Sequence, residues 1–361
     1  MTLQSVSPKM NELSVSGVSI KGLAAAVPSK REDNSQLDSL SEKARNEIIE
    51  QVGIRYRFIA PPEVTAADLC QTSAEKLISE LGWKPQEIGL LVFVTQTPDH
   101  IVPGTATQLQ HKLGLDRNAI CLDINQGCSG YVYGLSVVSG MMKSYNIDRA
   151  LLLVGDTITR MISKEDNSLR PIFSDAGSAT ALELDAISQN KMTFRLGSKG
   201  DAFEAIHVSD GGARNPMNAR SLVKEKISEG VLRQRNQLSM NGQAVFTFGL
   251  SVVASEISAL LESEKKTEKD IDHLVLHQAN QLLNNAIVRK VGFPKEKAPS
   301  SLHDFGNTSC ATVPITLVSQ LREAMEKETL QLLLSGFGVG LSWGNVILST
   351  DRIICPEIIY L

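Results

Sequence analysis

The sequence predicts an α/β protein made of two similar halves, in which helices and buried sheets alternate in layers. Two short apolar runs in the first half, residues 91–94 and 151–155, recur in the second half at nearly constant spacing. Leu274 matches Leu91 at an offset of 183 (274 − 91), and Leu332 matches Leu151 at an offset of 181 (332 − 151). Because helical patterns separate the runs, we expect each half to contain βαβ units and a mostly parallel, buried sheet.

The other elements follow from local patterns along the chain. Residues 18–26 predict an opening strand, and residues 121–123 a short strand before a turn. Residues 211–240 are polar and basic, and we interpret them as a surface excursion over a functional site. Amphipathic or small-residue periodicity predicts helices over residues 40–51, 66–81, 129–143, 247–262 and 312–327.

Length and charge limit the organisation and the partners of the chain. The 361 residues, 42% of them hydrophobic, are enough for a large core and predict two tightly packed halves. We place a flexible tail at residues 1–16, a nucleophile-bearing half at 17–185 and a second half at 186–361. The formal charge is −4 (36 − 40) and does not indicate a nucleic-acid partner.

The cysteines and the hydropathy pattern indicate a cytoplasmic protein. The chain has five cysteines, an odd number, without the spacing of metal ligands, which is typical of reduced thiols. No apolar run reaches membrane-spanning length, and the start of the sequence lacks the pattern of a signal peptide. We therefore expect neither a membrane association nor a bound metal.

Three polar residues at strand ends or turns predict nucleophilic catalysis. Cys128 follows the Gly127 turn and precedes a helical pattern, a position that favours thiolate over thiol. His277 ends a short apolar run, and Asn307 lies in a turn before another helix. Strand ends of both halves meet at one edge in such sheets, so the three side chains are expected to form one site. Taken singly, each of these residues is more often structural.

These segments resemble the β-ketoacyl-acyl-carrier-protein synthase III family of thiolase-like condensing enzymes, and the similarity covers nearly the whole chain. The resemblance implies the thiolase-like five-layer αβαβα fold of two duplicated halves. It also implies an acyltransferase that works as a homodimer, without a cofactor, on acyl-CoA or acyl-carrier-protein thioesters. The supporting motifs are Asp123 to Gly130, Leu274 to Asn280, His303 to Ser309, Val52 to Arg55, Phe173 to Ala179 and Gly336 to Gly344.

The resemblance also implies a role for each site residue. Cys128 carries the acyl group, while His277 and Asn307 polarise the thioester carbonyl of a malonyl-type extender so that carbon dioxide leaves. The backbone N–H groups of Cys128 and Val339 are candidates for the oxyanion hole, because the glycines that flank Val339 permit close approach. Residues implied in binding are Met240, Gly242, Phe246 and Asn280 in the pantetheine tunnel, and Arg289 and Lys290 at the docking site for an acyl carrier protein.

Several positions depart from the family pattern and leave the acyl donor open between CoA and a carrier protein. Relatives that use acyl-CoA commonly flank the adenine with an aromatic residue and arginines. This chain has Glu47 and Gln51 there, and Asn167 or, with a shifted loop, Arg170. Leu282 occupies the position of a usual carrier-docking arginine.

The acyl chain and the acceptor also stay open. The resemblance places Val102 at the acyl pocket of the partner subunit, where a larger Phe is common, and so predicts a roomier pocket. We expect decarboxylative condensation with malonyl-acyl carrier protein, in fatty-acid or specialised acyl-chain synthesis. The alternative is an acyltransferase of the same fold that moves the acyl group to an oxygen or nitrogen acceptor without decarboxylation.

Overall fold

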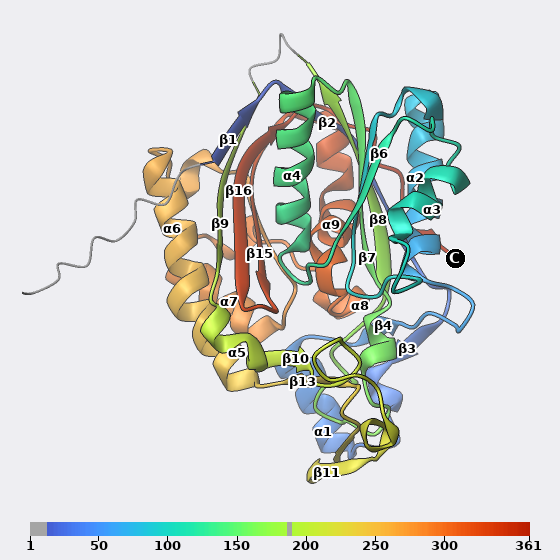
Figure 1. Ribbon diagram of the computed structural model, residues 1–361. Coiled ribbons are helices and arrows are strands. Elements are labelled where there is room, and N and C mark those ends of the chain that lie inside the picture. The colour runs from blue at the N-terminus through green and yellow to red at the C-terminus, as the bar shows by residue number, and fades with distance from the viewer. Residues whose placement is uncertain (1–12, 186–189) are drawn as a thin grey trace, which may run out of the picture.

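Two β-sheets lie side by side, with helices between them and on both outer faces (Figure 1). The structure is a computed structural model and describes residues 13–185 and 190–361. The N-sheet has the order β17-β2-β8-β7-β5-β6. Its strands are β2 (Val18–Val27), β5 (Leu90–Val94), β6 (Ile120–Ile124), β7 (Arg149–Asp156), β8 (Ala176–Leu184) and β17 (Ile359–Tyr360). The C-sheet has the order β1-β9-β16-β15-β14. Its strands are β1 (Leu13–Ser16), β9 (Lys191–Ser198), β14 (His273–Leu276), β15 (Leu330–Gly338) and β16 (Ser342–Thr350).

The helices complete five layers and confirm the predicted αβαβα fold. Between the sheets lie α4 (Gly130–Tyr145) and α9 (Thr312–Lys327). The outer face of the N-sheet carries α2 (Ala66–Leu81) and α3 (Thr105–Lys112). The outer face of the C-sheet carries α5 (Gly242–Phe248), α6 (Ala254–Ser263) and α7 (Gln281–Lys290). The shorter elements are α1 (Glu42–Glu47), α8 (Leu302–Phe305), β3 (Arg31–Asp33), β4 (Tyr56–Phe58), β10 (Ile206–Val208), β11 (Glu225–Ser228), β12 (Val231–Arg233) and β13 (Leu238–Met240).

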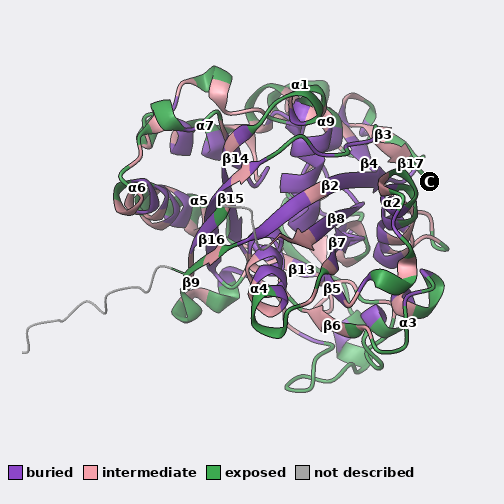
Figure 2. Ribbon diagram, turned by 90° about the horizontal axis from the view of Figure 1, so that it is seen from above, coloured by how far each residue is buried: buried purple, intermediate pink, exposed green. Residues whose placement is uncertain are grey.

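Each sheet is buried on both faces, which explains the continuous apolar runs of its strands (Figure 2). Along β5, Leu90, Val92 and Val94 belong to the core between the sheets, whereas Leu91 and Phe93 belong to the core beneath α2 and α3. Small residues let α4 approach the N-sheet closely. A Cβ on Gly134 would come within 2.6 Å of Leu152.

Both sheets are mixed, and the prediction of a mostly parallel sheet in each half is wrong for the C-sheet, where three of the four described strand pairings are antiparallel, whereas three of the five described pairings in the N-sheet are parallel. The strands of the repeated units, β5, β6 and β7 in one half and β14 and β15 in the other, run parallel. The strand that follows each unit runs antiparallel, as β8 does beside β7 and β16 beside β15. A buried apolar run predicts a strand but does not encode its direction, so periodicity alone missed these reversals.

The predicted tail is also partly wrong. Residues 13–16 form β1, which pairs antiparallel with β9 in the C-sheet. At the other end of the fold, β17 pairs parallel with β2 in the N-sheet. Each sheet therefore includes one short strand from the opposite part of the chain. Residues 1–12 of the expected tail, and residues 186–189 at the expected boundary between the halves, lie outside the described residues.

One helix also departs from expectation in its length. A π-helical turn, Gly249–Val253, joins α5 and α6 into a single helix over residues 242–263. By length and composition this helix is sufficient to cross a membrane, contrary to our expectation that no such segment exists. Its buried residues, including Val253, Ile257 and Leu260, pack in the core on the outer face of the C-sheet. Core helices of water-soluble proteins pass the same test.

Candidate active site

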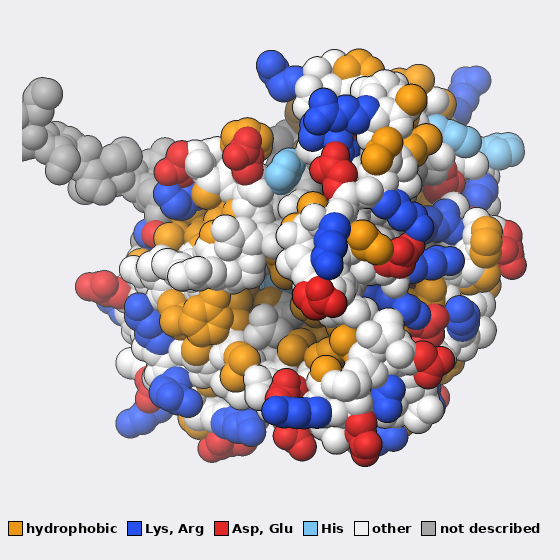
Figure 3. Space-filling model, turned by 90° about the horizontal axis from the view of Figure 1, so that it is seen from below, with side chains coloured by type: hydrophobic (Ala, Val, Ile, Leu, Met, Phe, Trp, Pro, Cys, Tyr) orange, Lys and Arg blue, Asp and Glu red, His pale blue; other side chains and the backbone are white. Residues whose placement is uncertain are grey.

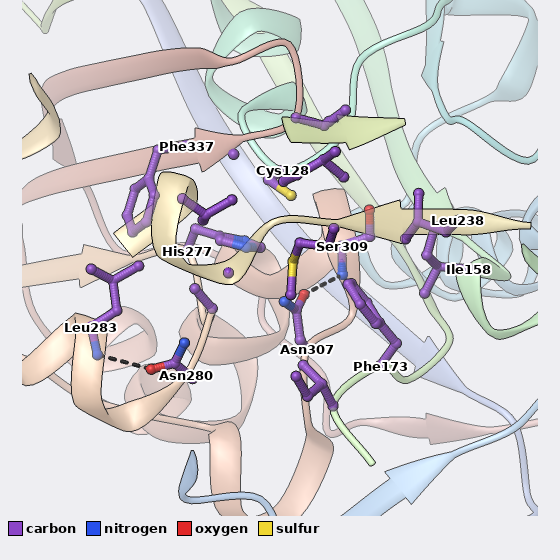
Figure 4. Close-up of a pocket in the computed structure, with 18 of the residues that line it drawn as sticks. Cys128, Ile158, Phe173, Leu238, His277, Asn280, Leu283, Asn307, Ser309 and Phe337 are labelled. Atoms are coloured by element: carbon purple, nitrogen blue, oxygen red, sulfur yellow. Dashed lines mark hydrogen bonds between the residues drawn. The ribbon is translucent and has the colours of Figure 1, made fainter. Parts of the chain in front are cut away.

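The two halves bring Cys128, His277 and Asn307 into one buried pocket. Cys128 lies between β6 and the start of α4, His277 follows β14, and Asn307 follows α8. Their exposed fractions are 9%, 2% and 5%, and all three line a cavity of about 70 Å³. Figure 4 shows the three side chains directed into the same space. The structure thus assembles the three residues that the sequence singled out.

Backbone N–H groups surround the sulfur of Cys128. The N–H of Val339 and that of Cys128 itself hydrogen-bond to the sulfur and work to lower the pKa of the thiol. Gly338 makes this approach possible, since a Cβ at this position would lie 2.6 Å from Cys128 Sγ. Its φ of 152° also favours glycine. The two N–H groups come from opposite halves of the chain and converge where a thioester oxygen would develop negative charge.

Burial outweighs these N–H groups at the resting thiol. Removal from water raises the pKa of Cys128 to about 11, and the negative charge of Asp156 acts in the same direction. Our expectation that the start of a helix favours the thiolate is therefore wrong for the enzyme without substrate. At neutral pH Cys128 is a thiol, and it must lose its proton during the attack itself.

His277 is a neutral imidazole that is held through both its backbone and its ring. Its backbone N–H donates to Ser335 O (2.7 Å), and its ring Nδ1 lies 2.7 Å from Thr312 Oγ1. Burial lowers the pKa of His277 to about 3, so the ring carries no charge at neutral pH. When the Thr312 hydroxyl donates to Nδ1, the ring proton stands on Nε2, which can then donate to a substrate oxygen.

Asn307 is oriented by the residue two positions later. Its Oδ1 accepts a hydrogen bond from the backbone N–H of Ser309 (3.0 Å), and its own N–H donates to Ile172 O (3.0 Å). The side-chain oxygen is therefore engaged, which leaves the NH₂ group as the part of the amide that can donate into the pocket.

The residues predicted for the tunnel also line this pocket. Met240, Gly242, Phe246, Asn280 and Val339 share its wall with the apolar side chains of Ile158, Phe173, Leu238, Val245, Leu283 and Phe337. The amide oxygen of Asn280 is already used, because it accepts from Leu283 N (2.9 Å) at the start of α7 (Figure 4). Seen from the side of α5 and β11, the molecular surface is hollowed near its middle, and hydrophobic side chains gather at the rim (Figure 3).

The other predicted site residues lie away from the pocket. Val102 is 81% exposed, on the loop between β5 and α3. Arg289 and Lys290 are exposed at the end of α7, where Lys290 Nζ donates to Leu250 O (2.8 Å). The basic excursion is exposed over most of residues 211–230, and its final strand, β13, brings Leu238 and Met240 to the pocket wall.

Sequence reasoning missed the polar residues behind the three site residues. Asp156 is fully buried at the end of β7, and Gln96 and Ser309 line the pocket. Asp156 offered a signal, because it ends a buried apolar strand just as His277 follows one. Thr312 carried no such signal, since its contact with His277 depends on how α9 is placed.

This fold and pocket define a thiolase-like condensing enzyme, and comparison with known proteins gives the family. Residues 122–200 match the family 3-oxoacyl-[acyl-carrier-protein (ACP)] synthase III, and residues 261–350 match its C-terminal part. A curated relative from Synechocystis sp., named beta-ketoacyl-[acyl-carrier-protein] synthase III, is 31% identical over 92% of this chain and 98% of its own length. The relative of the same name from Prochlorococcus marinus is 32% identical over 92% of this chain and 96% of its own.

Solved structures agree with the sequence comparisons. The 3-oxoacyl-(acyl-carrier protein) synthase from Burkholderia xenovorans is 34% identical, has a TM-score of 0.91 and covers 96% of this chain and 98% of its own. A second 3-oxoacyl-(acyl-carrier-protein) synthase III is 33% identical, with a TM-score of 0.87, over 92% of this chain and 99% of its own. The chain belongs to the 3-oxoacyl-acyl-carrier-protein synthase III family.

Proposed function

We propose that this enzyme joins an acyl group on Cys128 to a malonyl unit on acyl carrier protein, with loss of carbon dioxide. One observation carries the proposal. A single buried pocket holds a thiol with two backbone N–H groups at its sulfur, and beside it a neutral imidazole and an oriented amide. The relatives named beta-ketoacyl-[acyl-carrier-protein] synthase III support the same reaction.

In the loading step, the Cys128 sulfur attacks the carbonyl carbon of an acyl thioester. The oxygen becomes negatively charged and is stabilised by the N–H groups of Cys128 and Val339. When the intermediate collapses, the bond to the departing sulfur breaks, and the proton of Cys128 ends on the departing thiol.

In the condensation step, His277 and Asn307 hold the thioester carbonyl of the malonyl group. The carboxylate leaves as carbon dioxide, and its bonding electron pair forms an enolate whose oxygen accepts hydrogen bonds from both residues. The enolate carbon attacks the acyl carbonyl on Cys128, the C–S bond breaks, and the departing sulfur takes a proton from water. Both residues are neutral hydrogen-bond donors, and the Asn307 amide cannot take a proton, so the pair suits enolate stabilisation better than base catalysis. The apolar wall disfavours the localised carboxylate charge that is lost.

We further propose the partners and the setting. Arg289 and Lys290 form a basic pair on the surface that suits an acidic carrier protein. The enzyme works as a homodimer in which Val102 of the partner subunit closes the acyl pocket. The acyl donor is a thioester of CoA or of a carrier protein. All five cysteines are unpaired, which supports a cytoplasmic location.

The test separates the two half-reactions. His277→Ala or Asn307→Ala should lower carbon dioxide release from malonyl-acyl carrier protein by about two orders of magnitude, the scale of a lost oxyanion donor. Loading of Cys128, measured by mass spectrometry of the intact protein, should fall less.

Two variants serve as matched controls. His273→Ala alters the opposite end of the same strand, and Asn285→Ala alters an exposed position on α7. Both controls should keep both activities. Equal loss of the two half-reactions in the His277 and Asn307 variants would contradict this division of roles. Product formation without carbon dioxide release would favour transfer to an oxygen or nitrogen acceptor.

A further inference from the structure

Asp156 is a buried carboxylate that the proposed reaction does not use. It ends β7, has no exposed surface, and is surrounded by hydrogen-bond donors. Its Oδ1 accepts from Thr95 Oγ1 (2.9 Å) and from the backbone N–H of Gln96 (2.7 Å). Its Oδ2 accepts from Ser309 Oγ (2.6 Å). Burying a carboxylate costs free energy unless hydrogen-bond donors surround it, so the donors around Asp156 indicate that the carboxylate has a role in this position.

These contacts join the two halves of the enzyme at the site. The Gln96 segment follows β5 in the first half of the chain, whereas Ser309 lies just before α9 in the second half. Gln96 also packs against the turn that precedes the nucleophile, because a Cβ on Gly127 would lie 2.3 Å from Gln96 Oε1. Through Asp156, the loop that carries Asn307 is therefore hydrogen-bonded to the segment of Thr95 and Gln96, which also lies beside the turn before Cys128.

Ser309 contacts both of the residues that act on the malonyl group. Its backbone N–H donates to Asn307 Oδ1 (3.0 Å), and its backbone forms a hydrogen bond with the ring of His277. Thr312 Oγ1 lies 2.7 Å from His277 Nδ1 and 3.2 Å from Ser309 O, so this side chain links the His277 ring to the Ser309 backbone. Ser309 holds a left-handed backbone with a φ of 54°, which a residue other than glycine seldom adopts without support.

The internal repeat shows how this arrangement relates to the nucleophile. Ser309 matches Cys128 at an offset of 181 (309 − 128), the same offset that relates the two halves. Phe337 matches Asp156 at the same offset (337 − 156). In the first half, the cysteine turn meets the end of β15, where Gly338 leaves the sulfur accessible. In the second half, the equivalent turn meets the end of β7, where the hydroxyl is bound to a carboxylate.

We propose that Asp156 is a positioning residue for decarboxylation, which acts through Ser309 to fix the orientation of Asn307 and His277. This inference rests on the roles proposed for those two residues. Asp156 is fully buried and does not line the pocket. It holds the turn that presents the two hydrogen-bond donors, and its loss should affect the malonyl half-reaction more than acyl loading.

Ser309→Ala and Asp156→Asn test this proposal. Ser309→Ala removes only the hydroxyl that bonds to Asp156, whereas Asp156→Asn keeps the size of the buried side chain. Ser335→Ala is the matched control, because Ser335 is equally buried and its hydroxyl has no hydrogen-bond partner among the described residues. We expect Ser309→Ala to lower carbon dioxide release about tenfold to a hundredfold, the effect of misplacing a catalytic group by about 1 Å. Loading of Cys128 should change by less than about threefold, and Ser335→Ala should change neither rate.

A double-mutant cycle distinguishes positioning from general loss of structure. If Ser309 acts through Asn307, Ser309→Ala should lower carbon dioxide release little further in an enzyme that already carries Asn307→Ala. Additive losses, equal loss of loading and decarboxylation, or an equal effect of Ser335→Ala would overturn the proposal. If Asp156→Asn fails to fold, Ser309→Ala still decides. If Asn307→Ala itself leaves carbon dioxide release intact, the proposed function fails. If Asn307→Ala abolishes release but Ser309→Ala does not, only the positioning role fails.

Discussion

Replacing Gly338 by Ala should impair the nucleophile Cys128 although Cys128 itself is unchanged. The added Cβ would lie 2.6 Å from Cys128 Sγ and 2.7 Å from Cys128 Cβ. Non-bonded heavy atoms rest at about 3.5–4.0 Å, so one of the two segments must move by about 1 Å. The φ of 152° at Gly338 adds backbone strain for alanine. A shift of this size costs about a hundredfold in rate when it separates reacting groups.

The assay follows acyl loading of Cys128 over time by mass spectrometry of the intact protein, beside thermal unfolding. We expect Gly338→Ala to load about a hundredfold more slowly and to lose about 1–3 kcal/mol of stability through overpacking. Gly140→Ala is the matched control, because nothing lies within 4 Å of a Cβ at this position in α4. It should load normally and gain about 0.5–1 kcal/mol from its helical position. A Gly338→Ala enzyme with normal loading and normal stability would refute the close approach.

Three further expectations concern the thiol, the acyl pocket and the core. Because burial raises the pKa of Cys128 to about 11, the thiolate fraction and hence iodoacetamide alkylation should rise about tenfold per pH unit from about pH 7 to about pH 10; a plateau near neutral pH would show a preformed thiolate. Val102→Phe should shift loading rates toward acetyl over longer acyl thioesters, since each buried methylene contributes about 0.8 kcal/mol; an unchanged chain-length preference would contradict a role at the pocket. Arg57→Ala should lower the free energy of unfolding, measured in urea, by about 3–5 kcal/mol, because Arg57 is buried and donates to Glu32 (2.9 Å) and Asn34 (2.8 Å). A loss below about 1 kcal/mol would show that these contacts contribute no more than a surface ion pair does.

The sequence predicted those features of the fold that depend on local pattern. The amphipathic run at 66–81 is α2, whose start is capped by Thr65 and Asp68 and whose end is Gly82 with a φ of 64°. The repeated apolar runs are β5, β7, β14 and β15. Strand direction and the membership of β1 could not be predicted, because both depend on long-range pairing that hydropathy does not encode.

The same division applies to the site. Cys128 and His277 stood out because each polar side chain follows a short apolar run, and Asn307 because it lies in a turn before a helical pattern. The pKa of Cys128 could not be predicted, because burial depends on how Gly338 and Val339, from the other half of the chain, lie against the sulfur. The anchoring by Asp156 was equally hidden, since its partner Ser309 lies 153 positions away in the sequence.

The exchange of short strands between the sheets has a consequence for how the chain reaches its native state. Leu13 of β1 pairs with Phe194, in the second half of the chain, and Ala26 of β2 pairs with Ile359, close to its end. During synthesis, β2 cannot pair with β17 until the last residues are made, and β1 cannot pair until β9 has been made. Neither half can settle fully before nearly the whole chain has emerged from the ribosome. Contacts this distant in sequence favour slow folding, with long exposure of the apolar layers to chaperones.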